Sequence, residues 1–143
     1  MTEITIRAAI KSDSPHIARL VSQLGYPTTE TEMEERLQVL LPLPEYVTFV
    51  AVAQGRIIGL IGAYLGYALE FSGTYGRLTG VVVDESHRDS GVGKMLLDHM
   101  ESWLKQRGAR MVTLTSGSQR TEAHGFYRHL GYEETGLRFA KPL

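Results

Sequence analysis

The chain contains no cysteine. It therefore forms no disulfide, holds no metal through thiolates and cannot carry an acyl group on a cysteine during a two-step transfer. Long apolar runs are also missing, so no segment reaches the length of a membrane-spanning helix. The first residues, 1–4, lack the basic and apolar regions of a secretory signal. These absences predict a cytoplasmic protein without a membrane partner.

Charge of either sign is not in excess. Fifteen lysines and arginines stand against 16 acidic residues, and the formal net charge is −1. Such a balance argues against nucleic acid as a partner, because non-specific binding to phosphates needs a strong basic surplus. The five histidines show no metalloprotease-type spacing, so no metal site is expected. With 43% apolar residues over 143 positions, one domain spanning 1–143 is predicted.

Apolar periodicity predicts an α/β fold in which strands and helices alternate. Helix starts are indicated by N-cap residues at 12–14 and by capping boxes that open at 29 and 31. The predicted strands cover 3–8, 47–53, 57–65, 77–83, 111–114 and 132–140, and residues 66–76 are predicted to form a loop or irregular strand end. The predicted helices end before Gly25, Pro42, Gly108 and Gly131.

One stretch points directly to chemistry. The apolar strand that includes Val81, Val82 and Val83 leads into a turn, and the turn ends in Arg-x-x-Gly-x-Gly-Lys at the start of an amphipathic helix. A helix N-terminus presents unpaired backbone N–H groups, and glycines let a ligand approach them closely. Arg88 and Lys94 add positive charge on either side. The sequence therefore predicts a ligand that carries phosphate.

Two common phosphate-binding patterns fail on these residues. A P-loop aligned on Gly93 and Lys94 needs a glycine where Arg88 stands and a hydroxyl where Met95 stands. A dinucleotide fingerprint that begins at Gly91 needs a third glycine where Leu96 stands. An ATP- or NAD-binding domain is therefore a weaker alternative.

The pattern Arg-x-x-Gly-x-Gly between a strand and a long helix, within 81–103, resembles the GNAT superfamily of acyl-CoA-dependent N-acyltransferases. A second segment, residues 123–132 (AHGFYRHLGY), resembles the A-x-x-F-Y-x-x-x-G-[FY] segment of the same superfamily. The flanking regions also fit, so the resemblance covers essentially the whole chain. It implies a mixed central sheet of six or seven strands, about four flanking helices, and a splayed strand pair that holds the coenzyme.

The resemblance also implies a reaction, in which an acetyl group moves from acetyl-CoA to a primary amine without a metal. Because the chain has neither cysteine nor a G-x-S-x-G elbow, direct attack by the amine in a ternary complex is the expected route. A small-molecule acceptor is favoured, either a polyamine or amino acid or an aminoglycoside-like amine. A protein acceptor and a non-catalytic acyl-CoA-binding module are alternatives. Homodimers are common among such proteins, so a second copy is a candidate partner.

The resemblance assigns coenzyme contacts mainly to the backbone. The strand residues Val81, Val82 and Val83 would face the pantetheine arm, and an N–H near Val81 would polarise the thioester carbonyl. The pyrophosphate would be bound by the backbone of Arg88, Asp89, Ser90, Gly91, Val92, Gly93 and Lys94.

Side-chain roles are assigned to three positions. Tyr127 matches a tyrosine placed near the thioester sulfur, where its phenol would protonate the departing thiolate; an ordinary buried aromatic is the alternative. Phe126 would pack in the core or wall the coenzyme tunnel. Arg120 stands where many relatives carry asparagine, and it either contacts the coenzyme or is a solvated surface charge. Residues 116–119 offer further polar contacts.

A general base is not apparent on the central strand, because residues 77–83 include no carboxylate. Glu70 is the nearest candidate in the sequence, with Tyr75 and His124 after it. Glu70 as a surface carboxylate is the plain alternative. An amine of lowered pKa, or a chain of waters, would make a dedicated base unnecessary.

Overall fold

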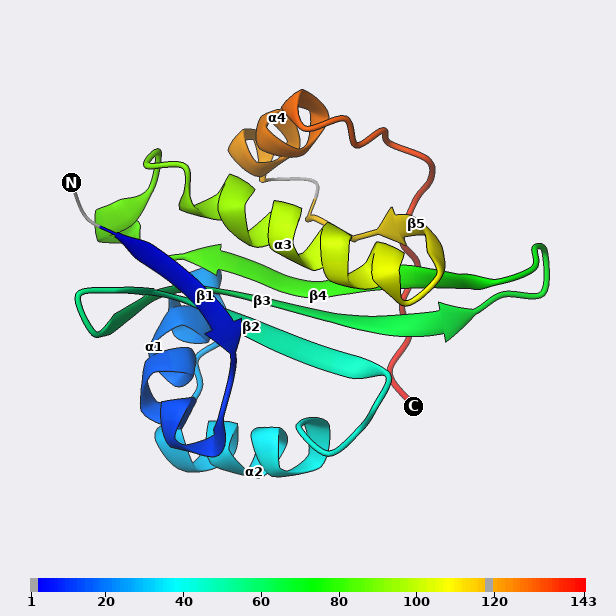
Figure 1. Cartoon of the computed structure of the whole chain (residues 1–143). Helices are drawn as coiled ribbons and strands as arrows, with labels where there is room; N and C mark the ends of the chain where they lie inside the picture. The colour runs from blue at the N-terminus through cyan, green and yellow to red at the C-terminus, as the bar shows by residue number, and fades with distance from the viewer. Residues whose placement is uncertain (1–2, 118–119) are drawn as a thin grey trace. The chain divides into compact units, whose positions relative to one another are not determined.

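A computed structural model describes residues 3–117 and 120–143 of the chain (Figure 1). The chain falls into two compact units, with the boundary between Thr113 and Leu114. We call them the N-terminal unit and the C-terminal unit and describe each by itself. The prediction of a single domain over residues 1–143 stays a prediction.

The N-terminal unit is built on a mixed sheet whose strands follow one another in space as they do in the chain. Antiparallel pairing joins the first four strands, and the last two strands run parallel. The α/β prediction is confirmed, but the sheet has five strands in the described residues rather than six or seven. The strands are β1 (Ile4–Ala8), β2 (Tyr46–Ala53), β3 (Arg56–Tyr67), β4 (Thr74–Val83) and β5 (Ala109–Thr113).

Helices cover both faces of this sheet, with α1 (Ser14–Leu24) and α2 (Glu30–Leu40) on one face and α3 (Val92–Gln106) on the other (Figure 1). A continuous apolar core lies between the sheet and the helices α1 and α2, and it includes Leu20, Leu37 and Val82. On the α3 face, a Cβ added at Gly76 would lie 2.5 Å from Leu104 Cδ1, so glycine is required for the helix to pack this closely.

Residues 66–76, predicted to form a loop or irregular strand end, are strand at both ends and loop between them. Strand β3 continues to Tyr67 and β4 begins at Thr74, and these two residues face each other at the end of the hairpin. Tyrosine and threonine favour strands, and cross-strand pairing stabilises them despite the glycines around them.

The C-terminal unit contains α4 (Thr121–His129), followed by residues 130–143 in irregular conformation. The predicted strand over 132–140 is therefore wrong. Leu137 and Phe139 do alternate with polar residues, but their side chains are 80% and 88% exposed. Alternation produces a strand only where another strand supplies hydrogen-bond partners, and this segment pairs with none in the described part of the chain.

A β-bulge interrupts the pairing of β3 with β4. Gly62 faces Gly80 and Ala63 faces Leu78, so Thr79 is the extra residue on β4. A Cβ added at Gly62 would lie 2.7 Å from Thr79 Oγ1, which shows how closely the bulge residue packs on β3. The Thr79 hydroxyl thus occupies space that glycine at position 62 leaves free.

We expect Gly62→Ala to lower the free energy of unfolding by about 1–3 kcal/mol, because the new methyl group displaces Thr79 Oγ1. Thr79→Ala should recover most of that loss when the two changes are combined. A double-mutant cycle in urea should therefore give a coupling energy of about 1 kcal/mol or more. Simple additivity of the two costs would contradict the contact.

Candidate active site

Strand β4 leads through a single 3-10 turn (Glu85–His87) into a short loop that enters α3. The loop turns on two residues with left-handed backbone, Asp89 at φ 62° and Gly91 at φ 88°. The Ser90 hydroxyl donates to the carbonyl oxygen of His87 within the same turn. We call residues 84–91 the entry loop.

The N-terminus of α3 has backbone N–H groups that are available to bind an anion. Gly91 is its N-cap and no side chain caps it in the described residues. The first hydrogen bond of the helix runs from Met95 N to the Gly91 carbonyl at 3.1 Å. The N–H groups of Val92, Gly93 and Lys94 therefore precede the helical hydrogen bonds, at the positive end of the helix dipole.

The two cationic side chains predicted at this site, Arg88 and Lys94, each contact another group of the protein. Lys94 Nζ lies 2.7 Å from Asp98 Oδ2 on the exposed surface of α3, and this contact raises the pKa of Lys94. Arg88 Nε donates to the Val83 carbonyl at 3.4 Å. Because both side chains contact other groups of the protein, the prediction that the coenzyme is bound mainly by backbone groups is compatible with this geometry.

Strand β4 continues beyond its pairing with β5. The pairing ends where Arg77 faces Thr113, whereas β4 runs on to Val83. Val82 is buried in the core, and Val81 and Val83 are half-buried. The β5 side of residues 78–83 is therefore without a strand partner in the described residues, and this stretch ends at the entry loop.

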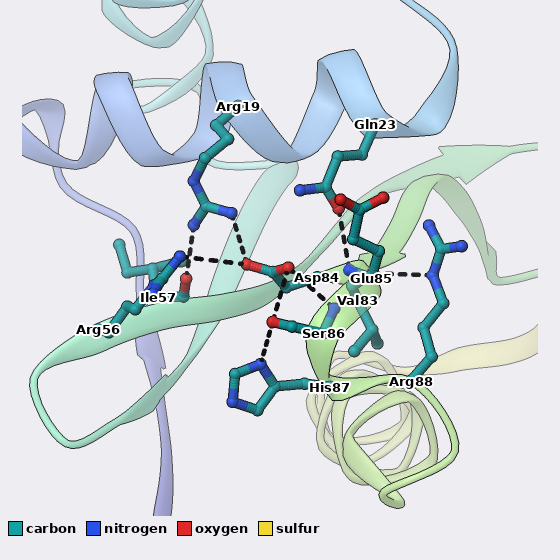
Figure 2. A network of polar contacts seen from close by, with 10 residues as sticks. All are labelled: Arg19, Gln23, Arg56, Ile57, Val83, Asp84, Glu85, Ser86, His87 and Arg88. Atoms are coloured by element: carbon teal, nitrogen blue, oxygen red, sulfur yellow. Dashed lines mark hydrogen bonds and ion pairs between the residues drawn. The ribbon is translucent and has the colours of Figure 1, made fainter.

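Asp84 is a buried carboxylate at the start of the entry loop, and its side chain is 4% exposed (Figure 2). Its Oδ2 accepts from Arg19 Nη1 at 2.5 Å and lies 3.8 Å from Arg56 Nη2. Its Oδ1 accepts from the backbone N–H and the hydroxyl of Ser86 at 3.2 and 3.1 Å. Burial alone would raise the pKa of Asp84, but the hydrogen bonds from Ser86 and Arg19 lower it to about 2.

This depressed pKa makes a testable contribution to stability. The contribution is fully present above the pKa of an unfolded aspartate, near 4, and is lost as the pH falls through about 2. We expect it to be on the order of 2 kcal/mol. Urea unfolding of wild type and Asp84→Asn at a series of pH values should show the free-energy difference between them shrinking in that window. A difference that does not change with pH would contradict the assignment.

A pocket of about 220 Å³ lies on the α2 side of the sheet. Its walls come from the end of β1, the end of α2, the start of β2, the second half of β3 and the bulge residue Thr79 of β4. None of its lining side chains is charged. The lining residues are Ala8, Ala9, Leu40, Leu41, Tyr46, Val47, Thr48, Ala63 and Thr79.

An aromatic row extends from this pocket toward the tip of the β3–β4 hairpin. The ring centroids of Tyr46 and Tyr64 are 5.2 Å apart, and those of Tyr64 and Tyr75 are 6.5 Å apart. The neighbouring Tyr64 raises the pKa of Tyr75. Glu70 lies in the exposed tip beyond Thr74, which places it about 20 Å along the strand from Val81. The structure therefore does not bring Glu70 and Val81 together.

The predicted side chains of the C-terminal unit cluster on α4. Tyr127 is half-buried, with ring centroids 5.4 Å from Phe126 and 5.8 Å from Tyr132. Burial raises the pKa of Tyr127, against the opposing charge of Arg120. Phe126 is 36% exposed and so is not a core residue, and Arg120 is an exposed N-cap residue.

Residues 116–119 are only partly covered by the structure. The Ser116 hydroxyl is buried and has no hydrogen-bond partner in the described residues. Ser118 and Gln119 lie outside the described residues. A buried hydroxyl without a partner is unfavourable, so Ser116 fits a site that a polar ligand completes.

Sequence reasoning missed the residues that hold the entry loop. Arg19 and Arg56 contact Asp84 from far away in the chain, and Gln23 accepts from the Glu85 N–H at 3.0 Å. The one local signal is an acidic residue, Asp84, directly after the predicted strand; its burial is visible only in the structure. Among the described residues, no group of three or more histidine or acidic side chains is arranged to hold a metal, and no helix is long and apolar enough to cross a membrane.

Comparison with known proteins identifies the family of this chain. Residues 17–132 match the family model described as "Acetyltransferase (GNAT) family". The chain therefore belongs to the GNAT family, and it is an acetyl-CoA-dependent N-acetyltransferase. The resemblance predicted from the two motifs is confirmed.

Two relatives and one solved structure illustrate the range of the family. An aminoglycoside N(6′)-acetyltransferase type 1 from Stenotrophomonas maltophilia is 30% identical over 97% of this chain and 94% of its own. An aminoalkylphosphonate N-acetyltransferase from Salmonella typhimurium is 30% identical over 66% of this chain, and the match spans only 61% of that enzyme. The aminoglycoside N-acetyltransferase AAC(6′)-Iy in complex with CoA shares the fold, with a TM-score of 0.89 at 24% identity over all of this chain and 96% of that one.

Proposed function

We propose that the protein transfers the acetyl group of acetyl-CoA to the primary amine of a small molecule, by direct attack in a ternary complex. The observation that supports it best is the continuity of β4 with the entry loop. Residues 78–83 lack a β5 partner and lead through the entry loop to an uncapped helix N-terminus. One strand edge and one loop thus offer backbone groups to the pantetheine arm and to the pyrophosphate.

In this proposal the backbone supplies most of the coenzyme contacts. The N–H groups of Val92, Gly93 and Lys94 bind the pyrophosphate, with Arg88, Asp89, Ser90 and Gly91 shaping the loop before them. An N–H near Val81 polarises the thioester carbonyl, while Val82 and Val83 continue the strand edge. Ser116 Oγ, buried without a partner, accepts or donates one further hydrogen bond, and Arg120 and Phe126 line the coenzyme.

The reaction needs two proton movements. The coenzyme supplies the thioester whose carbonyl carbon the amine attacks, so that a C–N bond forms and the C–S bond breaks. Tyr127, whose phenol is protonated at neutral pH and whose pKa is raised further by burial, donates a proton to the departing thiolate and is reprotonated by solvent. The amine loses its proton to water. Glu70 is too far from Val81 along the hairpin to take this proton directly. It would receive the proton only through a chain of waters.

The pocket supports a small acceptor. It is near Val81, because Thr79 in its wall is two residues away on β4. Its volume and its uncharged walls suit a compact, partly apolar molecule better than a polypeptide. The names of two relatives describe acetylation of aminoglycosides and aminoalkylphosphonates, which are both small amines.

The test begins with thermal unfolding of the protein with and without acetyl-CoA, CoA, ATP and NAD. Ligand at about one hundred times its dissociation constant adds roughly 2.7 kcal/mol, a shift of several degrees for a domain of this size. We expect the CoA species alone to stabilise the protein. Release of CoA is then measured with small amines and with lysine-containing peptides. Turnover with peptides only would support a protein acceptor, and binding without any turnover would support a non-catalytic module.

A further inference from the structure

The entry loop is tied to a helix that is remote from it in the sequence. Figure 2 shows Arg19 and Gln23 extending from α1 toward Asp84 and Glu85. Arg19 Nη1 donates to Asp84 Oδ2 at 2.5 Å, and Glu85 N donates to Gln23 Oε1 at 3.0 Å. Arg19 and Gln23 are four residues apart on α1, so they project from the same side of the helix. We call Arg19, Gln23 and Asp84 the loop latch.

The latch is also fixed to the sheet. Arg19 Nη2 donates to the Ile57 carbonyl at 3.0 Å, and Asp84 N donates to the Ile58 carbonyl at 2.7 Å. Asp84 in turn orders the loop that follows, because its carboxylate accepts twice from Ser86 and its carbonyl accepts from His87 N at 2.8 Å. These hydrogen bonds, together with those from Arg19 and Gln23, hold the first residues of the entry loop in one place.

The rest of the entry loop depends on that anchor. Its path needs left-handed backbone at Asp89, a conformation that a residue with a side chain adopts at a cost. A loop of this kind keeps one geometry only when its surroundings impose it. A loop that is already ordered loses less conformational freedom when a ligand binds, and the ligand binds more tightly as a result.

We propose that Arg19 and Gln23 are positioning residues for the coenzyme, which hold the entry loop in its pyrophosphate-binding geometry before acetyl-CoA arrives. The inference rests on the proposed role of this loop in coenzyme binding. It deepens that role, because it assigns part of the coenzyme affinity to α1 side chains that contact the loop and the sheet rather than the coenzyme. The latch acts on coenzyme binding and leaves the chemical step unchanged.

Electrostatics alone would predict a different pattern. If only charge mattered, Arg19→Met would weaken binding of the anionic coenzyme, whereas Asp84→Asn would strengthen it by removing a negative charge from the site. Gln23→Leu would have no effect. If the latch positions the loop, all three changes weaken binding, because each removes a hydrogen bond that orders it. The sign of the Asp84→Asn effect thus separates the two explanations.

The chain offers a matched control in a second ion pair. Arg7 donates to the buried carboxylate of Asp13 at 2.8 and 3.0 Å, where β1 leads to α1. Hydrogen bonding from Arg7 lowers the pKa of Asp13, as the Arg19 contact does for Asp84. Arg7→Met therefore removes a comparable pair that does not contact the entry loop.

The experiment measures the dissociation constant of CoA by calorimetry and the kinetics of acetyl-CoA turnover for wild type, Arg19→Met, Gln23→Leu, Asp84→Asn and Arg7→Met. For the three latch variants we expect CoA to bind at least about tenfold more weakly, which is about 1.4 kcal/mol, and KM for acetyl-CoA to rise in parallel. Their kcat should stay within about threefold of wild type. Arg7→Met should lower the melting temperature but leave CoA binding within about twofold.

Other results would overturn the latch. CoA binding by Gln23→Leu and Asp84→Asn that equals or exceeds wild type would show that the loop needs no tether. Equal losses in Arg7→Met would show a general effect of stability. If Arg19→Met does not fold, Arg19→Lys keeps the charge without the two-pronged hydrogen bonding, and Gln23→Leu carries the test. Wild type that binds no CoA would refute the proposed coenzyme role of the loop itself, which is a separate outcome.

Discussion

Replacing Gly93 with glutamate is expected to raise KM for acetyl-CoA by about one hundredfold or more. Gly93 lies in the first turn of α3, where the uncapped N–H groups are proposed to bind the pyrophosphate. A carboxylate at this position repels the pyrophosphate and interacts with the same N–H groups. Initial rates at a series of acetyl-CoA concentrations give the effect on KM directly.

The same change should not weaken the fold. An acidic side chain in the first turn of a helix is favourable, and glutamate has a higher helix propensity than glycine. We therefore expect Gly93→Glu to melt no lower than wild type in the absence of ligand. Gly93→Gln is the matched control, since it adds a side chain of the same size without charge and should raise KM by about tenfold or less. Equal KM values for the two variants would show that size alone, and not charge, decides binding.

Replacing Tyr127 with phenylalanine should lower kcat by about 10- to 100-fold while CoA binds with unchanged affinity. The phenol is the proposed proton donor to the departing thiolate, and its pKa is raised by burial. A raised pKa means that the hydroxyl stays protonated through the neutral and mildly alkaline range. The ratio of wild-type to variant kcat should therefore be constant between about pH 7 and pH 9.

Tyr132 provides the control for this change. Its ring lies against that of Tyr127 at 5.8 Å, so Tyr132→Phe also removes a hydroxyl from the same aromatic cluster. We expect Tyr132→Phe to keep kcat within about threefold of wild type. A similar loss in both variants would indicate that aromatic packing, and not proton donation, supports turnover. Unchanged turnover in Tyr127→Phe would remove the tyrosine from the mechanism.

Local sequence patterns predicted most of the elements. The Thr29 side chain accepts from Glu32 N and the Glu32 carboxylate accepts from Thr29 N, as the capping box at the start of α2 predicts. Gly25 ends α1 in a left-handed conformation. Such signals act between residues a few positions apart, so the sequence contains everything needed to recognise them.

Predictions that depended on distant partners were less accurate. Residues 132–140 alternate as a strand should, yet they pair with no strand in the described residues. Residues 66–67 and 74–76, predicted as part of a loop or irregular strand end, are regular strand because β3 and β4 pair to the end of the hairpin. In both cases the outcome depends on whether another strand lies alongside, which periodicity within a segment cannot report.

The sequence by itself determined the class of ligand and the family, since Arg-x-x-Gly-x-Gly before a helix and the segment 123–132 are contiguous patterns. It also placed glycines at the entry to the following helix, where a ligand can approach the backbone closely. The structure shows that Gly91 there is the uncapped N-cap of α3 and has a left-handed backbone. Only the tertiary structure decided what holds that turn in place. Arg19 and Asp84 are 65 positions apart, and they meet because α1 packs against the sheet beside β3 and β4.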